Sequence, residues 1–266
     1  MWKTLYLLNS LVLTSDNVLS TAHSQFGFEP KVVGGTSTTI DKHPYQLSLR
    51  KLDAHYCGAT LIAPKIALTA AHCLYNTRPE IITVRGGSSY HKRGGQVLQV
   101  AKICSHPKYS ANSSDYDVSV LLLYETFSPK WKIRAIPAQV RGRDVAVGRM
   151  GMVAGWGQLS FNGPMPDEIN VVRLPRIHHD DCARYYPEES VTDRMVCYGY
   201  QEGGKDVCYG DSGGAIMVGG RLSGISSWGY GCGFPRRPNV FTKVSNPEIN
   251  DFITKFLNDL SLFDHC

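Results

Sequence analysis

Three short segments of the chain hold residue types that together suit nucleophilic catalysis. His72 follows an apolar run, Asp115 and Asp117 precede another, and Ser212 lies inside the glycine-rich segment 210–214. A serine hydroxyl is a poor nucleophile at neutral pH, so it needs a neighbouring base, and the base needs a group that fixes its tautomer. Glycines beside the serine let the backbone turn sharply and aim N–H groups at a developing oxyanion. Each segment alone is weak evidence, because a histidine after a strand is more often structural and such a serine stretch is often only a turn.

Short strands separated by turn residues are predicted to position these segments. The predicted strands are 46–49, 59–62, 66–69, 81–85, 96–103, 118–124, 150–156, 168–174, 215–218, 221–226 and 240–244. Many short strands at this spacing are typical of antiparallel barrels or sandwiches. The 26 glycines and 14 prolines agree with a fold that contains many tight turns.

The C-terminal region departs from this pattern and is predicted to be helical. Ser245 or Asn246 is the candidate N-cap, and Pro247 lies near the first turn. The apolar residues that recur at helical spacing are Ile249, Phe252, Ile253, Phe256, Leu257 and Leu260. We expect this face to dock on the core, and a partner-binding role is the alternative.

Composition describes a folded globular protein and excludes several other classes. Of the 266 residues, 42% are hydrophobic and 19% are charged, which excludes a disordered chain, a coiled coil and a collagen-like repeat. The net charge is only +5 and the Lys and Arg residues are dispersed, so nothing indicates nucleic-acid binding. The eight cysteines fit either disulfides in an oxidising compartment or metal ligands.

The N-terminus has the layout of a secretory signal peptide. Lys3 is followed by a mostly apolar stretch through Leu13, and small residues near Ala22 offer a cleavage region. We therefore predict a signal peptide over residues 1–22 and a secreted, extracellular protein, in which disulfides are the default state of cysteine. The stretch is shorter than the roughly 20 apolar residues of a membrane-spanning helix, so no membrane attachment is expected.

Taken together, the motifs resemble those of the trypsin/chymotrypsin family of secreted serine proteases, the family in which the Ser-His-Asp mechanism is best described. The resemblance runs from Val32 to about Leu260, and the chain order His, Asp, Ser differs from that of subtilisins and α/β-hydrolases. Its motifs are 32–35, 44–49, 68–73, 155–157, 210–214 and 227–229. The resemblance implies an all-β fold with two six-stranded antiparallel β-barrels packed together, the active site between them and a C-terminal α-helix. One protease domain would span residues 32–266.

The resemblance implies a role for each candidate residue. Ser212 would attack the scissile carbonyl, His72 would take and return the proton, and Asp117 would orient His72 and stabilise its cation. The N–H groups of Gly210 and Ser212 would form the oxyanion hole, and Asp115 is interpreted as a loop residue. Ser227 would support Asp117. An extended substrate would pair with Ser227, Trp228 and Gly229.

Members of the family are made as zymogens, so the resemblance implies activation by cleavage after Lys31. The new N-terminus at Val32 would enter the protein and pair its ammonium with Asp211, because an unpaired buried charge is too costly to persist. The propeptide, residues 23–31, contains no cysteine and so cannot stay attached through a disulfide. An activating protease is therefore an expected partner, beside protein or peptide substrates and protein inhibitors.

The predicted specificity pocket departs from that of trypsin. Asp206, six residues before Ser212, matches the acid at the base of trypsin's pocket and favours cleavage after Arg or Lys. Asn239 stands where trypsin has a glycine, Val207 replaces the usual serine beside the acid, and Gly229 keeps one wall open. Restricted trypsin-like specificity is expected, and chymotrypsin- or elastase-like specificity is the alternative.

The resemblance also suggests how the cysteines pair. Three pairs are implied by the family: Cys57–Cys73, Cys182–Cys197 and Cys208–Cys232. The two cysteines that remain, Cys104 and Cys266, are expected to form a fourth bridge, as in similar snake-venom members.

No metal or cofactor is expected. The segment 178–181 combines two histidines with two aspartates, but neighbouring side chains rarely converge on one ion, so it is interpreted as a solvated loop. The loop 88–95 matches a calcium-binding loop of the family but holds no acid. Asn112 is the acceptor of an N-glycosylation sequon just before Asp117, where a glycan would screen the substrate cleft.

A secreted protease homologue that only binds or regulates is the alternative from another functional class. Such proteins usually lack a member of the triad, whereas His72, Asp117 and Ser212 are all present. We therefore expect an active, monomeric endopeptidase. Digestive enzymes, salivary or venom components and cascade proteases share these motifs, and a role in digestion or in a secretion is the favoured interpretation.

Overall fold

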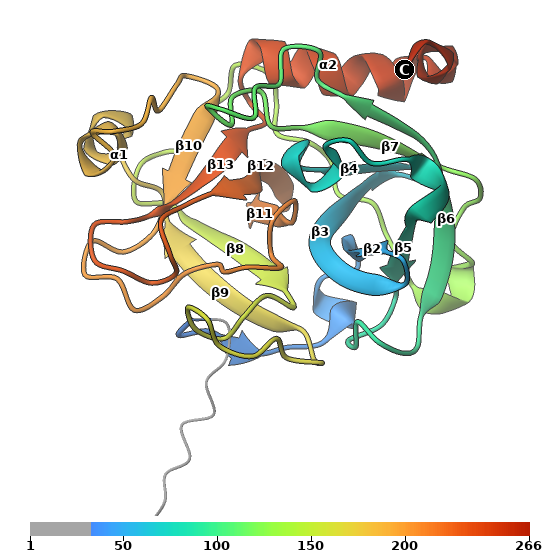
Figure 1. The fold of residues 1–266 in the computed structure, drawn as a ribbon, viewed down its shortest axis with the longest axis horizontal. Helices are drawn as coiled ribbons and strands as arrows, with labels where there is room; N and C mark the ends of the chain where they lie inside the picture. Colours follow the sequence, from blue (N-terminus) through green and yellow to red (C-terminus); the bar gives the residue numbers. More distant parts are fainter. Residues whose placement is uncertain (1–32) are drawn as a thin grey trace, which may run out of the picture.

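The computed structural model describes residues 33–266, so the expected signal peptide (1–22), the propeptide (23–31) with Lys31, and Val32 lie outside the described residues. The described chain forms two β-rich halves that lie side by side, with the C-terminal helix along one end (Figure 1). Within residues 33–266, no helix is long and apolar enough to cross a membrane.

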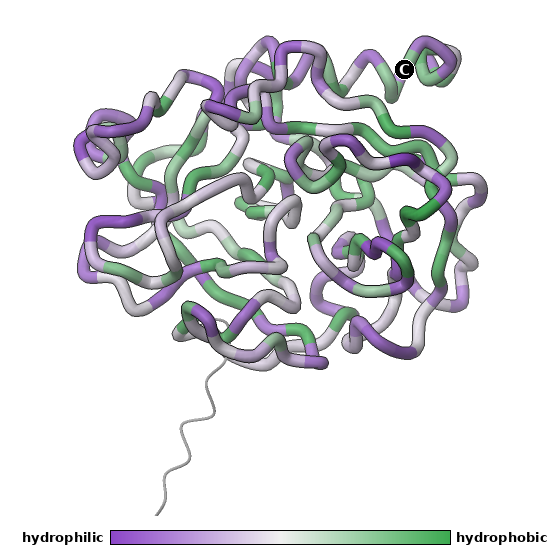
Figure 2. Tube along the Cα trace, viewed as in Figure 1, coloured by the Kyte–Doolittle hydropathy of each residue, from purple (hydrophilic) through white to green (hydrophobic). Residues whose placement is uncertain are grey.

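The first half is a closed barrel of antiparallel strands in the order β2-β3-β4-β7-β6-β5. The bounds are β2 Gln46–Lys51, β3 Ala54–Ala63, β4 Ile66–Thr69, β5 Ile82–Gly86, β6 Gln96–Ser105 and β7 Ser119–Leu123. Closure pairs every strand edge, and the apolar side chains of Leu47, Leu68 and Leu121 are fully buried in its core. Figure 2 shows hydrophobic residues gathered along the strands and hydrophilic residues in the connecting loops.

The second half is a seven-stranded antiparallel sheet in the order β1-β9-β8-β11-β12-β13-β10. The bounds are β1 Thr36–Ser37, β8 Met150–Gly155, β9 Asn170–Pro175, β10 Met195–Tyr198, β11 Ala215–Val218, β12 Arg221–Trp228 and β13 Asn239–Lys243. The mostly β fold in two halves with a C-terminal helix is confirmed. Six strands, β8 to β13, build the second half, and the antiparallel bridge between Arg176 and Tyr198 joins the end of β9 to β10. The two-residue strand β1 adds a seventh strand by pairing with β9.

The predicted C-terminal helix is confirmed as α2, Pro247–Asn258. Asn246 caps it, since its side-chain oxygen accepts hydrogen bonds from the N–H groups of Glu248 and Ile249 (3.0 and 3.3 Å). Four of the expected apolar residues are buried against the core, namely Ile249, Phe252, Ile253 and Phe256. Leu257 and Leu260 are instead exposed, and Leu260 lies beyond the end of α2.

A second α-helix, α1 (His179–Tyr185), replaces the solvated loop expected at residues 178–181. His178 is its N-cap and accepts a hydrogen bond from the N–H of Asp180 (3.3 Å). The two aspartates of the first turn complement the positive end of the helix dipole, and buried Cys182 anchors the helix to β10. The polar side chains of the segment do lie at the surface, but on a helix.

Short 3-10 helices and disulfides complete the framework. The 3-10 helices are η1 Ile40–Lys42, η2 His72–Leu74, η3 Pro79–Ile81, η4 Pro129–Trp131 and η5 Leu260–His265. Four disulfides link the cysteines in the pairs that the resemblance implied: Cys57–Cys73, Cys104–Cys266, Cys182–Cys197 and Cys208–Cys232. The disulfide of Cys266 fastens the chain terminus to β6.

Candidate active site

Pairing of β4 with β7 brings His72 and Asp117 together. Thr69 pairs with Ser119 at the ends of these strands, so the residues just after β4 and just before β7 lie at the same edge of the barrel. His72 opens η2 there, and its Nδ1 lies 2.8 Å from Asp117 Oδ2. The backbone N–H of His72 donates to the other carboxylate oxygen, Oδ1, at 2.8 Å. Asp117 thus fixes both the position and the ring orientation of His72.

Asp117 is fully buried, and the second half of the molecule supplies further support for it. Ser227 Oγ donates to Asp117 Oδ2 at 2.5 Å, and Thr242 Oγ1 donates to the Asp117 carbonyl at 2.7 Å. A buried carboxylate is costly unless hydrogen bonds replace its water, and these donors do so. They leave an anion that can stabilise a positive charge on His72.

Ser212 lies on a loop that both halves hold. The Ser212 carbonyl accepts from the N–H of Gly58 in the barrel (2.7 Å), and Gly213 N–H donates to Ser226 in the sheet (2.8 Å). Gly210 has φ +97°, a conformation that L side chains rarely adopt. Within the described part of the chain, the N–H groups of Gly210 and Ser212 donate to no acceptor. Two free donors beside the serine are the arrangement that an oxyanion hole requires.

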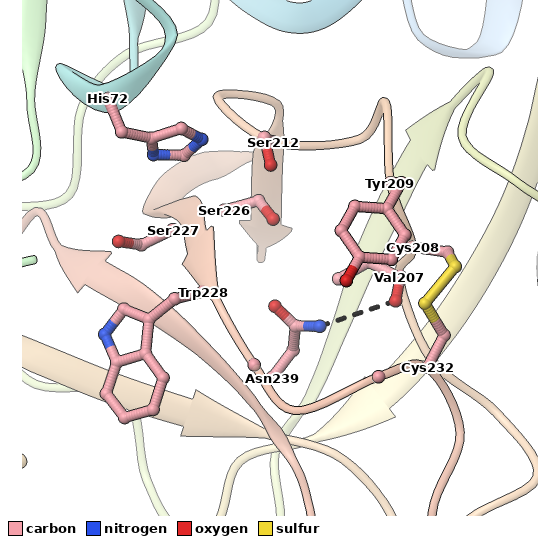
Figure 3. A pocket seen from close by; sticks show the side chains of 12 residues that line it. His72, Val207, Cys208, Tyr209, Ser212, Ser226, Ser227, Trp228, Cys232 and Asn239 are labelled. Atoms are coloured by element: carbon pink, nitrogen blue, oxygen red, sulfur yellow. Dashed lines mark hydrogen bonds between the residues drawn. A yellow bond between two sulfur atoms is a disulfide. The ribbon is translucent and has the colours of Figure 1, made fainter. Parts of the chain in front are cut away.

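His72 and Ser212 line one open cavity of about 330 Å³ between the halves (Figure 3). The cavity continues past Trp228, Gly229 and Asn239 to the disulfide Cys208–Cys232. A base, a hydroxyl and a cavity of this size together suit the binding and cleavage of an extended substrate.

Asp211 is buried next to Ser212 without a cation among residues 33–266. Its carboxylate accepts from the N–H groups of Gly157 (2.8 Å) and Cys208 (3.1 Å). Burial raises the pKa of Asp211 to about 6, because removal from water disfavours its charged form. A Cβ at Gly157 would lie 2.3 Å from Asp211 Oδ2, so the packing of the carboxylate requires glycine there.

Asp206 lies behind Asn239 rather than on the wall of the cavity. It is 3% exposed, and its oxygens accept from Val207 N–H (2.9 Å), Gly233 N–H (2.8 Å) and Asn239 Nδ2 (3.2 Å). Burial raises the pKa of Asp206 to about 7. Figure 3 shows the Asn239 nitrogen turned toward the Val207 carbonyl and its oxygen turned toward the Ser212 side of the cavity. The surface offered to a substrate at this point is therefore a carboxamide.

The remaining predicted site residues lie apart from this centre. Asn112 is exposed on a loop that shares a second hollow of about 240 Å³ with Trp228 and Gly229. Among residues 33–266, one group of side chains has the spacing of a metal site, Cys57, His72 and Cys73. Its two sulfurs form a disulfide and its histidine belongs to the centre just described, so the group does not suit a metal ion.

Residues that contact this centre without a recognisable signal in the sequence include His55 and Arg194. The partly buried His55 ring shares a hydrogen bond with Ser48 Oγ (2.8 Å) and lies close to Gly210. Removal from water lowers the pKa of His55 to about 3. Asp115, interpreted as a loop residue, forms a partly buried ion pair with Arg194. Arg194 lies 79 residues further along the chain, and no local pattern indicates such a contact.

Comparison with known proteins identifies the family. The trypsin family model matches residues 32–253. The chain is 37% identical to a vitellin-degrading protease of Bombyx mori, over 87% of this chain and 88% of the relative. It is 38% identical to a trypsin of Simulium vittatum (79% and 87%) and 37% identical to serine protease 1 of Rattus norvegicus (82% and 87%). The chain belongs to the trypsin family and is a serine-type endopeptidase.

Proposed function

We propose that Ser212, His72 and Asp117 are the catalytic triad of this endopeptidase. The observation that carries the proposal is the Asp117–His72 contact at the β4–β7 edge, which faces the same cavity as Ser212. The free N–H groups of Gly210 and Ser212 support it, because they lie beside the nucleophile.

The steps follow the mechanism general to the family. His72 takes the proton of Ser212 Oγ as the oxygen bonds to the scissile carbonyl carbon, and the oxyanion is bound by the N–H groups of Gly210 and Ser212. Each such donor stabilises the transition state by about 3 kcal/mol. The imidazolium then protonates the leaving amine as the C–N bond breaks, which leaves an acyl group on Ser212. Water attacks this acyl carbon with His72 as the base. The bond between the acyl carbon and Ser212 Oγ then breaks, His72 returns the proton to Oγ, and the acid product leaves.

Activation by cleavage after Lys31 is the second part of the proposal. The carbonyl of Val33, the first described residue, accepts a hydrogen bond from the Asp206 N–H (3.1 Å). The start of the proposed mature chain is therefore attached to the backbone at Asp206. An ammonium on Val32 would supply the cation that buried Asp211 lacks among residues 33–266, and would thereby stabilise the loop of Gly210 and Ser212. N-terminal sequencing of the active form is expected to begin at Val32.

The proposed specificity is for Lys or Arg before the scissile bond, supported by the buried carboxylate of Asp206 directly behind Asn239, which lines the cavity. Asn239 and Val207 restrict this specificity, because they place a carboxamide and an apolar side chain where trypsin leaves the acid open. Chymotrypsin- or elastase-like cleavage is the competing outcome. A panel of Lys, Arg, Phe, Leu and Ala p-nitroanilides separates the two.

We further propose that the protein is secreted as a monomer, is controlled by an activating protease and by protein inhibitors, and acts in digestion or in a secretion. Four disulfides and the predicted leader support the secretory route. The exposed position of Asn112 beside Trp228 supports a glycan at the edge of the substrate cleft. Recovery of the protein from the culture medium tests the secretory route. Mass spectrometry of that protein before and after deglycosylation tests for a glycan on Asn112.

The test of the triad is covalent labelling with a fluorophosphonate probe. The activated wild type is expected to be labelled on Ser212, and Ser212→Ala is expected to fold but to remain unlabelled. Ser160→Ala, at an exposed serine that is not part of the triad, is the matched control and is expected to label like the wild type. Labelling of Ser212→Ala at another serine, or an inert wild type, would overturn the assignment.

A further inference from the structure

Tyr116, the residue directly before Asp117, has an unusual backbone conformation. Its φ is +55°, in the left-handed region that costs a bulky residue about 1–3 kcal/mol. The N–H of Val118 donates to the Tyr116 carbonyl at 2.8 Å, so Asp117 lies at the centre of a tight three-residue turn. Other contacts must hold Tyr116 in this conformation, and they thereby determine where Asp117 points.

The Tyr116 ring is packed against three groups. It stacks on the His106 ring at 4.5 Å with an interplanar angle of 23°, and the Arg194 guanidinium carbon lies 4.5 Å from the ring centroid. Lys108 Nζ lies 5.2 Å from the same centroid. The Tyr116 hydroxyl donates to Glu248 Oε2 at 2.9 Å. The side chain is thus fixed at both its ring and its tip.

The backbone of Tyr116 is held through Asp115. Asp115 Oδ1 accepts from the Tyr116 N–H (2.9 Å) and from Thr192 Oγ1 (3.0 Å). Arg194 donates to the same carboxylate from Nε to Oδ1 (2.9 Å) and from Nη2 to Oδ2 (2.6 Å). Burial opposes ionisation of Asp115, but the hydrogen bonds from Arg194 and Thr192 hold its pKa below the ordinary value. The side chain of Arg194 is 22% exposed and that of Asp115 is 13% exposed, so solvent screens this ion pair less than it screens a pair at the surface.

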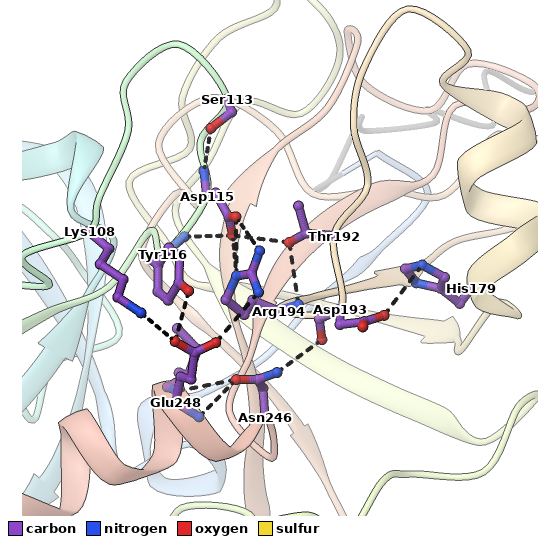
Figure 4. A network of polar contacts seen from close by, with 11 residues as sticks. Lys108, Ser113, Asp115, Tyr116, His179, Thr192, Asp193, Arg194, Asn246 and Glu248 are labelled. Atoms are coloured by element: carbon purple, nitrogen blue, oxygen red, sulfur yellow. Dashed lines mark hydrogen bonds and ion pairs between the residues drawn. The ribbon is translucent and has the colours of Figure 1, made fainter.

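These contacts join parts of the molecule that the chain does not connect locally (Figure 4). Asp115 and Tyr116 belong to the loop between β6 and β7 of the barrel, whereas Arg194 directly precedes β10 of the sheet. Glu248 in the first turn of α2 lies 3.6 Å from Arg194 Nη1. Arg194 therefore links the barrel, the sheet and the C-terminal helix beside Asp117. The triad spans the same boundary, with His72 and Asp117 on the barrel and Ser212 on the loop before β11.

We propose that Arg194 is a positioning residue for catalysis. By holding Asp115 and the Tyr116 ring, it maintains the turn that aims the Asp117 carboxylate at His72 and fixes both relative to Ser212. The inference rests on the proposed triad. It predicts an effect on the chemical step that exceeds any effect on substrate binding, because Arg194 does not line the substrate cavity.

The test compares activated Arg194→Ala with the wild type. We expect kcat to fall about 10- to 100-fold, since small misplacements of catalytic groups cost this much. KM is expected to stay within about threefold, because uniform binding is retained. The acid limb of the pH profile of kcat/KM is expected to move to lower pH, because a displaced Asp117 stabilises the imidazolium less. Arg194→Lys, which keeps the charge but loses the bidentate contact, is expected to lie between the two enzymes.

Arg141→Ala is the matched control, because Arg141 also makes a bidentate pair, with Asp251, but at an exposed site away from the triad. Its kcat and pH profile are expected to equal those of the wild type. If Arg194→Ala lowers Tm but leaves kcat and the pH profile unchanged, Arg194 only stabilises the fold, and the positioning role is refuted. If Arg194→Ala does not fold, Asp115→Asn, which keeps the side-chain shape, gives the same readouts with the same consequences. A wild type inert to the fluorophosphonate would instead refute the triad itself.

Discussion

Replacing Asn239 by glycine is expected to let the proposed pocket accept an arginine side chain as well as a lysine side chain. In the wild type, the Asp206 carboxylate already accepts three hydrogen bonds, from Val207, Gly233 and Asn239. A carboxylate has about four lone-pair sites, so about one remains. A guanidinium needs two parallel acceptors for its bidentate contact, whereas an ammonium can use one acceptor, such as the Asn239 oxygen. The wild type is therefore expected to cleave after Lys in preference to Arg.

The magnitude follows from the group that the substitution removes. Asn239→Gly deletes the Nδ2 donor at 3.2 Å from Asp206 Oδ1 and opens the floor of a cavity of about 330 Å³. A hydrogen bond to a charged group contributes about 1.5–3 kcal/mol, and a bound guanidinium would make the contact that Asn239 now occupies. At about 1.4 kcal/mol per factor of ten, the Arg-to-Lys ratio of kcat/KM is expected to rise roughly 10- to 100-fold.

The assay uses tripeptide p-nitroanilides that differ only in the residue before the scissile bond. Active-site titration sets the enzyme concentrations, and an Ala substrate, which does not reach Asp206, serves as the internal control and is expected to change by less than about threefold. An unchanged Arg-to-Lys ratio in Asn239→Gly would refute the reasoning. Preferred cleavage after Phe or Leu in the wild type would refute the assignment of Asp206 to substrate recognition as well.

Three further outcomes follow from other features. Burial raises the pKa of Asp206 to about 7, so the carboxyl is mostly neutral at pH 6 and charged at pH 8; the Lys-to-Ala ratio of kcat/KM is expected to rise across this range, and to be flat in Asp206→Asn. Removing the disulfide with Cys104→Ala and Cys266→Ala together, which opens a loop of 162 residues, is expected to lower the free energy of unfolding by about 2–5 kcal/mol, and denaturant titration measures it. Gly157→Ala places a methyl group 2.3 Å from the Asp211 carboxylate, so kcat/KM is expected to fall about 100-fold or more. An unchanged kcat/KM in this variant would contradict the expectation.

The sequence predicts the chemistry of the site better than its surroundings. His72, Asp117 and Ser212 each lie in a segment whose residue types indicate a role, and the register of β4 with β7 explains why the first two meet. The register itself was not predictable from periodicity, because alternation fixes the face of a strand but not its partner. The contact of Arg194 with Asp115 depends on the docking of the two halves, so no local pattern indicates it.

The misses in the fold have similar physical causes. Strand β1 has two exposed residues, too few for a periodic signal, and it exists only because β9 offers a free edge. Helix α1 has seven residues with buried Cys182 near its centre, so its polar start looked like a loop. Asn239, by contrast, is recognised from the sequence as the residue that restricts the pocket, and its hydrogen bond to Asp206 agrees with that interpretation.

The hydrogen bond from Gly58 to the Ser212 carbonyl has a consequence for when activity can arise. Gly58 belongs to the barrel and Ser212 to the other half, and a Cβ at Gly58 would lie 2.8 Å from the Gly214 Cα. The position of Ser212 therefore depends in part on direct contact between the backbones of the two halves. If only one half has folded, or if the two halves are docked slightly apart, His72 and Ser212 are not positioned together. Hydrolytic activity is therefore expected to arise only after the two halves have docked.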